Sequence, residues 1–333
     1  MACVAFFDVE KWEEEYLSKR LSAHKLEFHE ESLNLKNAHL AKECDAASIF
    51  IYSAINEGLL KKLPKLKIVA TRSTGFDHIN LSACRKKRVT VCNVPVYGEN
   101  TVAEHSFALI LNLSRKIHKA YERTVRGDFS LEGLMGFDLK GKTIGVVGVG
   151  NIGRHVIRIA KGFEMSVLGF DVKKPPGLGK KLGFKYVGLN ELLSKSDVVS
   201  LHVPYNKATH HLINESNIGL MKRGAVLINT SRGAVVSTDA IIIALQNGIL
   251  SGAGLDVLEE ENLIKEEAQL LSKQFPLSSL QTVVKNHILL KNENVIITPH
   301  IAWYSKEARQ RILETTAANL NAFFKKKPIN VVE

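Results

Sequence analysis

Apolar and polar positions alternate along this chain in two successive patterns. In residues 1–90, short apolar runs are separated by segments with helical spacing, and this alternation predicts βαβ units. The expected strands lie at Cys3–Asp8, Ser48–Ile51 and Leu66–Ala70, and the expected helices near Val9–Ala23 and Asn56–Leu63.

From Lys142 onward, the expected strands are apolar at nearly every position. Such strands are typical of a parallel sheet buried on both faces, with helical segments between the strands. They lie at Ile144–Val147, Ser166–Phe170, Val198–His202, Ala225–Ile228, Gly252–Leu255 and Val295–Thr298. This half of the chain therefore predicts an α/β domain of its own.

Two long segments with helical spacing flank this second pattern. Thr101–Val125 is long enough to bridge two domains, and Lys306–Phe324 is expected to be one helix that returns to the first domain. The second domain would then be inserted into the first. We expect a substrate domain of residues 1–100 plus 301–333 and a nucleotide-binding domain of residues 101–300, with 101–126 as the interdomain helix.

The composition excludes several classes of protein. The 333 residues are 45% hydrophobic and 24% charged, as in a globular protein of about two domains. No apolar stretch is long enough for a membrane helix, and the apolar start is too short for a signal peptide. The four cysteines form no CxxC pair, so we expect reduced, buried thiols, no metal site and a cytoplasmic location.

The chain carries 45 Lys and Arg against 34 Asp and Glu, a net charge of +11. The basic residues form short clusters, such as Arg85–Arg88 and Lys325–Lys327, without interleaved aromatic residues. Solvated faces explain these clusters better than a phosphate-binding patch does, so no nucleic-acid partner is expected.

One glycine-rich segment predicts a dinucleotide site. Gly148, Gly150 and Gly153 form a GxGxxG pattern directly after an expected strand and before an expected helix. In that context the glycines permit a tight turn and close approach to a diphosphate at the helix N-terminus. Asp171 follows the next strand, 23 residues after Gly148, where a carboxylate would bind the ribose hydroxyls. This favours NAD over NADP, although Lys173 and Lys174 leave the strictness of that choice open, and Asp171 could instead cap a turn.

Three side chains after the later strands have complementary chemistry. Arg232, Glu261 and His300 supply a guanidinium that can hold a carboxylate, and an imidazole with a carboxylate to orient it. Each alone is more typical of an ion pair, a structural histidine or a solvated acidic loop. Only their joint position at the carboxyl ends of strands indicates catalysis.

In its motifs, the chain resembles the NAD-dependent D-2-hydroxyacid dehydrogenases, and among them the D-lactate dehydrogenases. The motifs occur in the family's order over roughly residues 70–305, at Val96–Glu104, Gly148–Gly153, Leu201–Pro204, Asn229–Gly233, Gly254–Glu261 and Thr298–Tyr304. The resemblance implies a Rossmann-type domain inserted in a flavodoxin-like substrate domain, and a homodimer.

The resemblance also implies roles for individual residues. Arg232 would bind the substrate, His300 would act as acid and base, and Glu261 would bond to His300 and favour its protonated form. Residues implied to line the NAD site are Gly148, Gly150, Asn151, Ile152, Gly153, Asp171, Val203, Pro204, Thr209, Thr230, Ser231, Arg232 and Asp256. Those implied to bind substrate, with His300 and Arg232, are Thr74, Gly75, Tyr97 and Trp303, and Tyr52 is a further candidate for the pocket wall.

The expected reaction is reversible reduction of pyruvate to D-lactate by NADH. The aromatic pair Trp303-Tyr304 and the separation of 39 positions from Glu261 to His300 resemble those of D-lactate dehydrogenases. Two alternatives remain. One is another 2-keto acid, such as hydroxypyruvate, glyoxylate or a branched acid. The other is a NAD-sensing interaction protein like the C-terminal-binding corepressors, which share a similar His-x-Ala-Trp-Tyr run.

Overall fold

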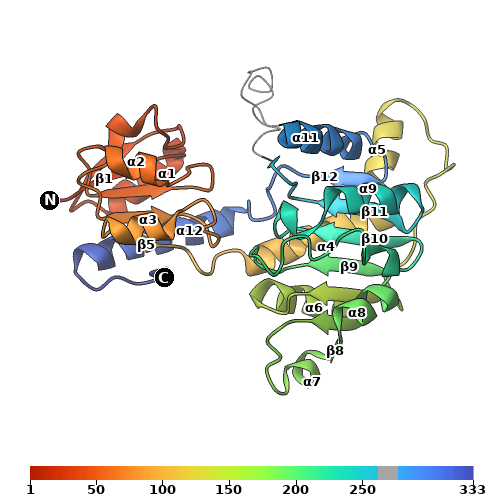
Figure 1. Cartoon of the computed structure of the whole chain (residues 1–333). Helices are drawn as coiled ribbons and strands as arrows, with labels where there is room; N and C mark the ends of the chain where they lie inside the picture. The colour runs from red at the N-terminus through yellow and green to blue at the C-terminus, as the bar shows by residue number, and fades with distance from the viewer. Residues whose placement is uncertain (262–276, 333) are drawn as a thin grey trace. The chain divides into compact units, whose positions relative to one another are not determined.

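The computed structural model describes residues 1–261 and 277–332, which form two compact α/β units (Figure 1). One unit comprises Met1–Gly98 and the segment that starts at Tyr304, and the other comprises Glu99–Trp303. Each unit has its own parallel sheet. The prediction of two parallel-sheet α/β domains is therefore confirmed.

The first unit has a five-stranded sheet in the order β2-β1-β3-β4-β5, parallel throughout. Its strands are β1 (Cys3–Phe6), β2 (Lys25–Phe28), β3 (Ala46–Ile49), β4 (Ile68–Thr71) and β5 (Thr90–Cys92). Its helices are α1 (Lys11–Arg20), the 3-10 turn η1 (Ala38–Ala41), α2 (Glu57–Lys62), α3 (Leu81–Lys86) and α12 (Lys306–Phe324). The expected helix Lys306–Phe324 is thus correct.

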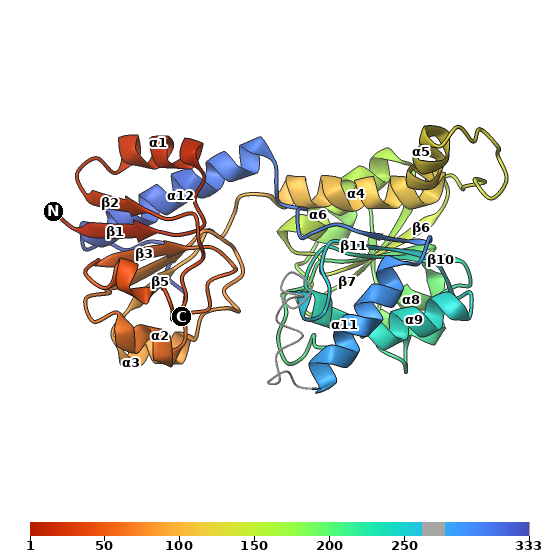
Figure 2. The same cartoon turned by 90° about the horizontal axis from the view of Figure 1, so that it is seen from above.

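Alternation along β1 divides the first unit into two cores. Successive side chains of a strand point to opposite faces of the sheet. Val4 and Phe6 pack with residues of α1 and α12, whereas Ala5 and Phe7 pack with residues of α2 and α3. Figure 2 shows these two pairs of helices on opposite faces of the sheet.

The second unit has a seven-stranded parallel sheet in the order β12-β11-β10-β9-β6-β7-β8. Its strands are β6 (Thr143–Val147), β7 (Ser166–Phe170), β8 (Lys185–Tyr186), β9 (Val198–Leu201), β10 (Ala225–Asn229), β11 (Leu250–Leu255) and β12 (Val295–Ile297). Its helices are α4 (Glu99–Arg115), α5 (Ile117–Val125), α6 (Asn151–Gly162), α7 (Leu178–Leu182), α8 (Leu189–Lys195), η2 (Ile218–Leu220), η3 (Gly233–Val235), α9 (Thr238–Gln246) and α11 (Leu277–Leu290).

Helices cover both faces of this sheet, as its fully apolar strands require. Residues of α4 and α6 form one core with Ile144 and Val146, and residues of α8, α9 and α11 form the other with Val147. The two groups of helices lie on opposite sides of the strands in Figure 2. In the part of the chain that the structure describes, no helix is both long enough and apolar enough to cross a membrane.

The single helix expected over residues 101–126 is wrong. Lys116 lies between α4 and α5 with a left-handed φ of 55°, which ends the first helix. The side chain of Asn112 accepts a hydrogen bond from the backbone N–H of His118 at 2.8 Å and so caps the new helix. A local side-chain contact therefore breaks a helix that contains neither proline nor an internal glycine.

The expectation of four reduced cysteines also fails. Cys3 at the start of β1 and Cys44 before β3 form a disulfide, with their Cα atoms 4.5 Å apart. The pairing of β1 with β3 brings these residues together across 41 positions of sequence. Cys84 and Cys92 are free and buried, as expected.

Candidate active site

The carboxyl ends of the second unit's strands share one edge of the sheet, because all its strands run parallel. In such sheets, ligands bind beyond this edge, near the strand where the order reverses. That strand is β6, whose neighbours are β9 and β7. The residues that follow the strands at this edge include Gly148, Asp171, Val203, Arg232, Asp256 and His300.

The glycine-rich turn after β6 has the geometry that a diphosphate site requires. Gly148 has a φ of 95°, and a Cβ there would lie 2.5 Å from the carbonyl oxygen of His202. A Cβ at Gly153 would lie 2.0 Å from the carbonyl oxygen of Gly148, whereas a Cβ at Gly150 would meet no atom within 4 Å. Gly150 caps α6 without a side-chain hydrogen bond, so the first N–H groups of the helix, at Asn151 and Ile152, remain available. The turn therefore fits the diphosphate of a dinucleotide.

Asp171 connects this turn to the end of β7. Its Oδ2 accepts from the N–H of Val149 at 2.7 Å, and its Oδ1 accepts from the N–H of Lys173 at 2.8 Å. It therefore caps a turn, as the simpler interpretation predicted. Since a carboxylate has about four acceptor positions, two remain for ribose hydroxyls.

The loop after β9 places three further candidates at the same edge. Val203 is half-buried, and its Cγ1 would lie 2.9 Å from a Cβ at Gly148. The hydroxyl of Thr209 donates to the carbonyl oxygen of Pro204 at 2.6 Å and accepts from the N–H of Asn206 at 2.8 Å. These bonds fix the turn from Pro204 to Thr209, which directly follows Val203.

A buried asparagine shapes the turn that carries Arg232. The side chain of Asn229 accepts from the N–H and the hydroxyl of Ser231, at 3.0 and 2.8 Å, and donates to the carbonyl oxygen of Arg232 at 2.9 Å. Thr230 is buried and lies 2.9 Å from the hydroxyl of Ser106. Asn229 is not among the predicted site residues, although a polar residue at the end of an otherwise apolar strand is a signal for it.

His300 and Glu261 form the hydrogen-bonded pair that the resemblance implied. Nδ1 of His300 lies 2.6 Å from Oε1 of Glu261, and the two side chains are 15% and 26% exposed. A left-handed φ of 57° at His300 turns its side chain at the end of β12. Nε2 of His300 makes no hydrogen bond to any residue between 1 and 261 or 277 and 332, so it can serve a ligand.

Asp256 holds the loop that contains His300. Its side chain is 1% exposed, and it accepts from the hydroxyl of Thr298 at 2.5 Å and from the N–H groups of Ile301 and Ala302, each at 2.9 Å. Its own carbonyl oxygen accepts from the N–H of His300 at 2.9 Å. His105 adds a contact at 3.4 Å, which sequence analysis did not anticipate. The carboxylate predicted to line the cofactor site therefore also orders the imidazole loop.

Three predicted substrate residues lie in the other unit. The loop after β4 exposes Thr74, whose hydroxyl donates to the carbonyl oxygen of Val94 at 2.8 Å. Within the described chain, the N–H groups of Thr74 and Gly75 donate no hydrogen bond, as a carboxylate-binding loop requires. Tyr97 is half-buried, and its carbonyl oxygen accepts from Nε of Arg311 at 2.5 Å. Their part in a common site with Arg232 and His300 remains a prediction.

Trp303 belongs to the same unit as His300. Its indole Nε1 donates to the carbonyl oxygen of His300 at 2.9 Å, which ties the aromatic ring to the imidazole loop. Tyr52, in the other unit, is exposed.

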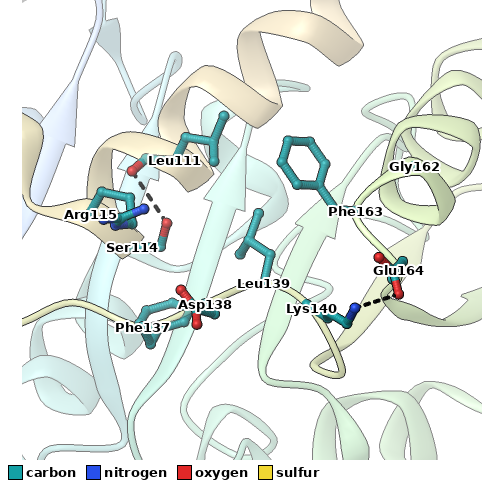
Figure 3. A pocket seen from close by; sticks show the side chains of 10 residues that line it. All are labelled: Leu111, Ser114, Arg115, Phe137, Asp138, Leu139, Lys140, Gly162, Phe163 and Glu164. Atoms are coloured by element: carbon teal, nitrogen blue, oxygen red, sulfur yellow. Dashed lines mark hydrogen bonds and ion pairs between the residues drawn. The ribbon is translucent and has the colours of Figure 1, made fainter.

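A cavity in the second unit lies away from these residues. It has a volume of about 390 Å³, and Figure 3 shows Leu111 and Ser114 of α4, Leu139 and Phe163 around it. Leu139 precedes β6 and Phe163 precedes β7, so the cavity lies at the amino ends of these strands. It is therefore separate from the candidate active site.

Comparison with known proteins gives a consistent family. The family model described as "D-isomer specific 2-hydroxyacid dehydrogenase, NAD binding domain" matches residues 107–302. D-lactate dehydrogenase of Escherichia coli (strain K12) is 37% identical over 326 residues, which cover 96% of this chain and 95% of that protein. Glyoxylate reductase of Thermococcus litoralis is 38% identical over 299 residues, which cover 87% of this chain and 84% of that protein.

Solved structures agree with this result. The crystal structure of D-lactate dehydrogenase from Aquifex aeolicus, complexed with NAD and lactic acid, matches with a TM-score of 0.87 and 40% identity. The match covers 97% of this chain and 96% of that one.

Proposed function

Because the chain belongs to the D-isomer-specific 2-hydroxyacid dehydrogenases, whose cofactor is NAD, we propose that it is a D-lactate dehydrogenase that interconverts pyruvate and D-lactate. In this proposal, the unit Glu99–Trp303 holds NAD and the other unit contributes substrate contacts through Thr74, Gly75 and Tyr97. The observation that carries the proposal is the His300–Glu261 pair at the sheet edge that also carries Arg232 and the glycine-rich turn.

The side chains at this edge suit acid–base chemistry on a 2-keto acid. The guanidinium of Arg232 would hold the carboxylate and polarise the keto oxygen. His300 would deliver a proton from Nε2 to that oxygen, while Glu261 accepts from the Nδ1–H, orients the ring and stabilises its charged form. NAD, when bound, supplies or takes up the hydride. In the reverse direction, the same imidazole would accept the hydroxyl proton.

The choice of pyruvate depends on the pocket walls. Trp303 is tied to the loop of His300 and would pack on the substrate methyl group, with Tyr97 and Tyr52 as further wall residues. A relative that reduces glyoxylate makes glyoxylate or hydroxypyruvate the second candidate substrate. The same three catalytic side chains would process each of these acids.

A substrate panel tests the proposal directly. NADH oxidation is measured with pyruvate, hydroxypyruvate, glyoxylate and a branched 2-keto acid, and the lactate formed is assigned to one enantiomer. We expect the highest kcat/KM for pyruvate and formation of D-lactate. A preference for glyoxylate or hydroxypyruvate would contradict the lactate assignment while retaining the family's chemistry.

The acid–base role of His300 has a separate test. The His300→Ala variant is expected to lose at least 1,000-fold in kcat, because a positioned general acid and its charge act together. Its affinity for NADH, measured by fluorescence, is expected to stay within about twofold. Retention of turnover would contradict the role of His300.

We also propose a homodimer formed through the second unit. The segment from Ile117 to Met135 exposes large apolar side chains, namely Ile117, Tyr121, Val125, Phe129, Leu131 and Met135. Figure 2 shows α5 and the following loop extending away from the sheet of their own unit. Exposed apolar patches of this kind mark protein interfaces.

The cytoplasmic location expected from the sequence stays part of the proposed function.

Sedimentation velocity tests the dimer. The double variant Phe129→Ser, Leu131→Ser is expected to shift the chain toward monomer, whereas Leu220→Ser, an exposed residue outside the segment, is expected to leave the mass unchanged. A monomeric unmodified chain at micromolar concentration would contradict the dimer.

A further inference from the structure

Glu259 lies two residues before Glu261 but faces away from the imidazole of His300, toward two other loops. Its Oε2 accepts from the N–H and the hydroxyl of Thr238, at 2.8 and 2.6 Å. Its Oε1 lies 2.6 Å from Nε2 of His211. These three residues, Glu259, Thr238 and His211, are called the Glu259 clamp below.

The clamp joins loops that follow three different strands. His211 comes from the loop after β9, Thr238 from the start of α9 after β10, and Glu259 from the loop after β11. The backbone N–H of His211 also donates to the carbonyl oxygen of Ala234 at 2.8 Å, two residues after Arg232. The loops that carry the substrate guanidinium and the imidazole's carboxylate are therefore tied to each other.

Close backbone packing reinforces this connection. A Cβ at Gly233 would lie 2.1 Å from the carbonyl carbon and oxygen of Leu258 and 2.4 Å from the nitrogen of Glu259. Gly233, which follows Arg232, thus lies directly against the backbone of Leu258 and Glu259, which precede Glu261. In addition, the buried side chain of Asn286 donates to the carbonyl oxygen of Glu259 at 2.8 Å.

A short, constrained path leads from the clamp to the catalytic pair. Glu260 has a left-handed φ of 52°, a conformation that a side chain rarely adopts unless its surroundings require it. This turn directs Glu259 to one side and Glu261 to the other. A displacement of Glu259 would therefore also move Glu261 and change its 2.6 Å contact with His300.

We propose that Glu259 is a positioning residue, which, through Thr238 and His211, fixes the Glu261 carboxylate against His300 and aligns it with Arg232. This inference rests on the proposed function, since it concerns the efficiency of the same acid–base pair. Glu259 itself contacts neither the imidazole of His300 nor the guanidinium of Arg232 in any hydrogen bond of the described residues.

Acidic and aromatic groups surround the imidazole of His211. Glu259 faces it from the loop after β11, and Glu215 faces it from the segment before η2. The ring of His210 stacks on it at 4.0 Å, and Tyr205 in turn contacts His210. The side chain of His211 is 36% exposed, whereas that of Glu259 is 17% exposed.

The Glu259→Gln variant tests the proposal with little change of shape. A glutamine keeps one acceptor oxygen for Thr238 but presents an uncharged N–H donor in place of the second oxygen, so His211 loses its carboxylate partner. We expect kcat for pyruvate reduction to fall about 10-fold, and the pH–rate profile to move toward lower pH by about one unit, because His300 loses part of the support from Glu261. The dissociation constant for NADH is expected to stay within about twofold.

Matched variants separate positioning from general destabilisation. Thr238→Ser keeps the hydroxyl and is expected to retain the pH–rate profile of the unmodified chain. Thr238→Val loses the hydroxyl, and its kcat and its pH–rate profile are expected to lie between those of the unmodified chain and those of Glu259→Gln. Asp239→Asn changes the neighbouring, half-exposed carboxylate, which pairs with Lys285, and is expected to leave kcat unchanged. A fall in kcat for Glu259→Gln without a displaced profile would mean a merely structural role and would overturn the proposal.

A second measurement does not depend on turnover. NMR signals of the His300 imidazole are compared in the unmodified chain, Glu259→Gln and Glu261→Gln. We expect Glu259→Gln to move the pH response of these signals in the same direction as Glu261→Gln, by a smaller amount. An unaltered response would overturn the clamp even if the chain reduces pyruvate, whereas a chain that reduces no keto acid would contradict the proposed function and leave this NMR result to decide the clamp.

Discussion

In each unit, the most deeply buried charged side chain among the described residues lies at the carboxyl edge of the sheet, and the two side chains have opposite charge. In the unit Glu99–Trp303 the ion is Asp256, 1% exposed, and its carboxylate accepts from backbone N–H groups of the His300 loop. In the other unit it is Arg72, 3% exposed, and its guanidinium donates to the carbonyl oxygens of Phe7 and Asp8, each at 2.6 Å. Burial lowers the pKa of Arg72, against the opposite effect of Glu13 and Asp8.

The two ions differ in what they hold. Asp256 orders a loop whose side chains carry chemistry, whereas Arg72 joins the ends of β4 and β1 and so orders the sheet itself. Backbone groups that face a buried charge gain strong hydrogen bonds and become costly to leave unpaired. We therefore expect loss of the anion to affect turnover most and loss of the cation to affect stability most.

Of the changes that test this comparison, Asp256→Asn is expected to have the largest effect. An asparagine cannot accept from Thr298, Ile301 and Ala302 at once, so the His300 loop would shift. A displacement of about 1 Å near the reacting atoms corresponds to a loss of about 100-fold in kcat. Steady-state kinetics measure this loss, and Asp239→Asn serves as the control.

The affinity of Asp256→Asn for NADH distinguishes between two roles of this carboxylate. If Asp256→Asn binds NADH normally but turns over slowly, its main role is to order the imidazole loop. If it turns over normally at saturation but binds NADH weakly, the role implied by family resemblance, a contact to the cofactor, is the main one.

A smaller effect, on stability, is expected from Arg72→Met. The carbonyl oxygens of Phe7 and Asp8 would lose their donor, which lowers the free energy of unfolding by about 2 kcal/mol. Urea denaturation measures the change, with the exposed Arg85→Met as the control. A variant as stable as the control would show that the buried cation is not needed to hold these strands together.

The smallest effect concerns a neutral group at the same edge as Asp256. Burial lowers the pKa of His202 to about 3 from its ordinary value of 6.5, and the buried Nδ1 has no hydrogen-bond partner in the described chain. Between these values the unfolded chain binds a proton that the folded chain does not, so the free energy of unfolding falls as the pH falls from about 6.5. The slope from this group is at most about 1.4 kcal/mol per pH unit.

Comparison with His202→Gln isolates this contribution. Urea denaturation at pH 7, 6 and 5 is expected to show a weaker dependence on pH in the variant than in the unmodified chain. Equal slopes would mean that other groups cause the whole loss of stability in acid.

Sequence patterns predicted the fold class because the central strands are strongly apolar. The edge strands β2, β5 and β8 escaped prediction, since Lys25–Phe28 has no fully buried residue, Thr90–Cys92 is short and Lys185–Tyr186 has only two residues. The break at Lys116 depends on the side chain of Asn112, and the Cys3–Cys44 disulfide on strand pairing. Neither leaves a periodic signal.

The candidate site was predictable to a different degree. Arg232, Glu261 and His300 could be selected because all three follow strands in the order of the family's motifs, although none of them indicates catalysis alone. Asn229 and His105 were not found, since each acts through other residues and His105 meets Thr298 across 193 positions. Of the segment between Glu261 and His300, residues 262–276 lie outside the described residues, and α11 begins at Leu277.

The absence of a side chain at Gly233 limits how this chain can be redesigned. The backbone of Leu258 and Glu259 fills the volume that any larger residue would require. Under the proposed function, a larger residue here would disturb the loop of Glu261 as well as the turn of Arg232, so a single change would trade new specificity for lost rate. Under the proposed function, Tyr52 and Tyr97 are therefore the positions to vary for an altered substrate range, since both belong to the first unit.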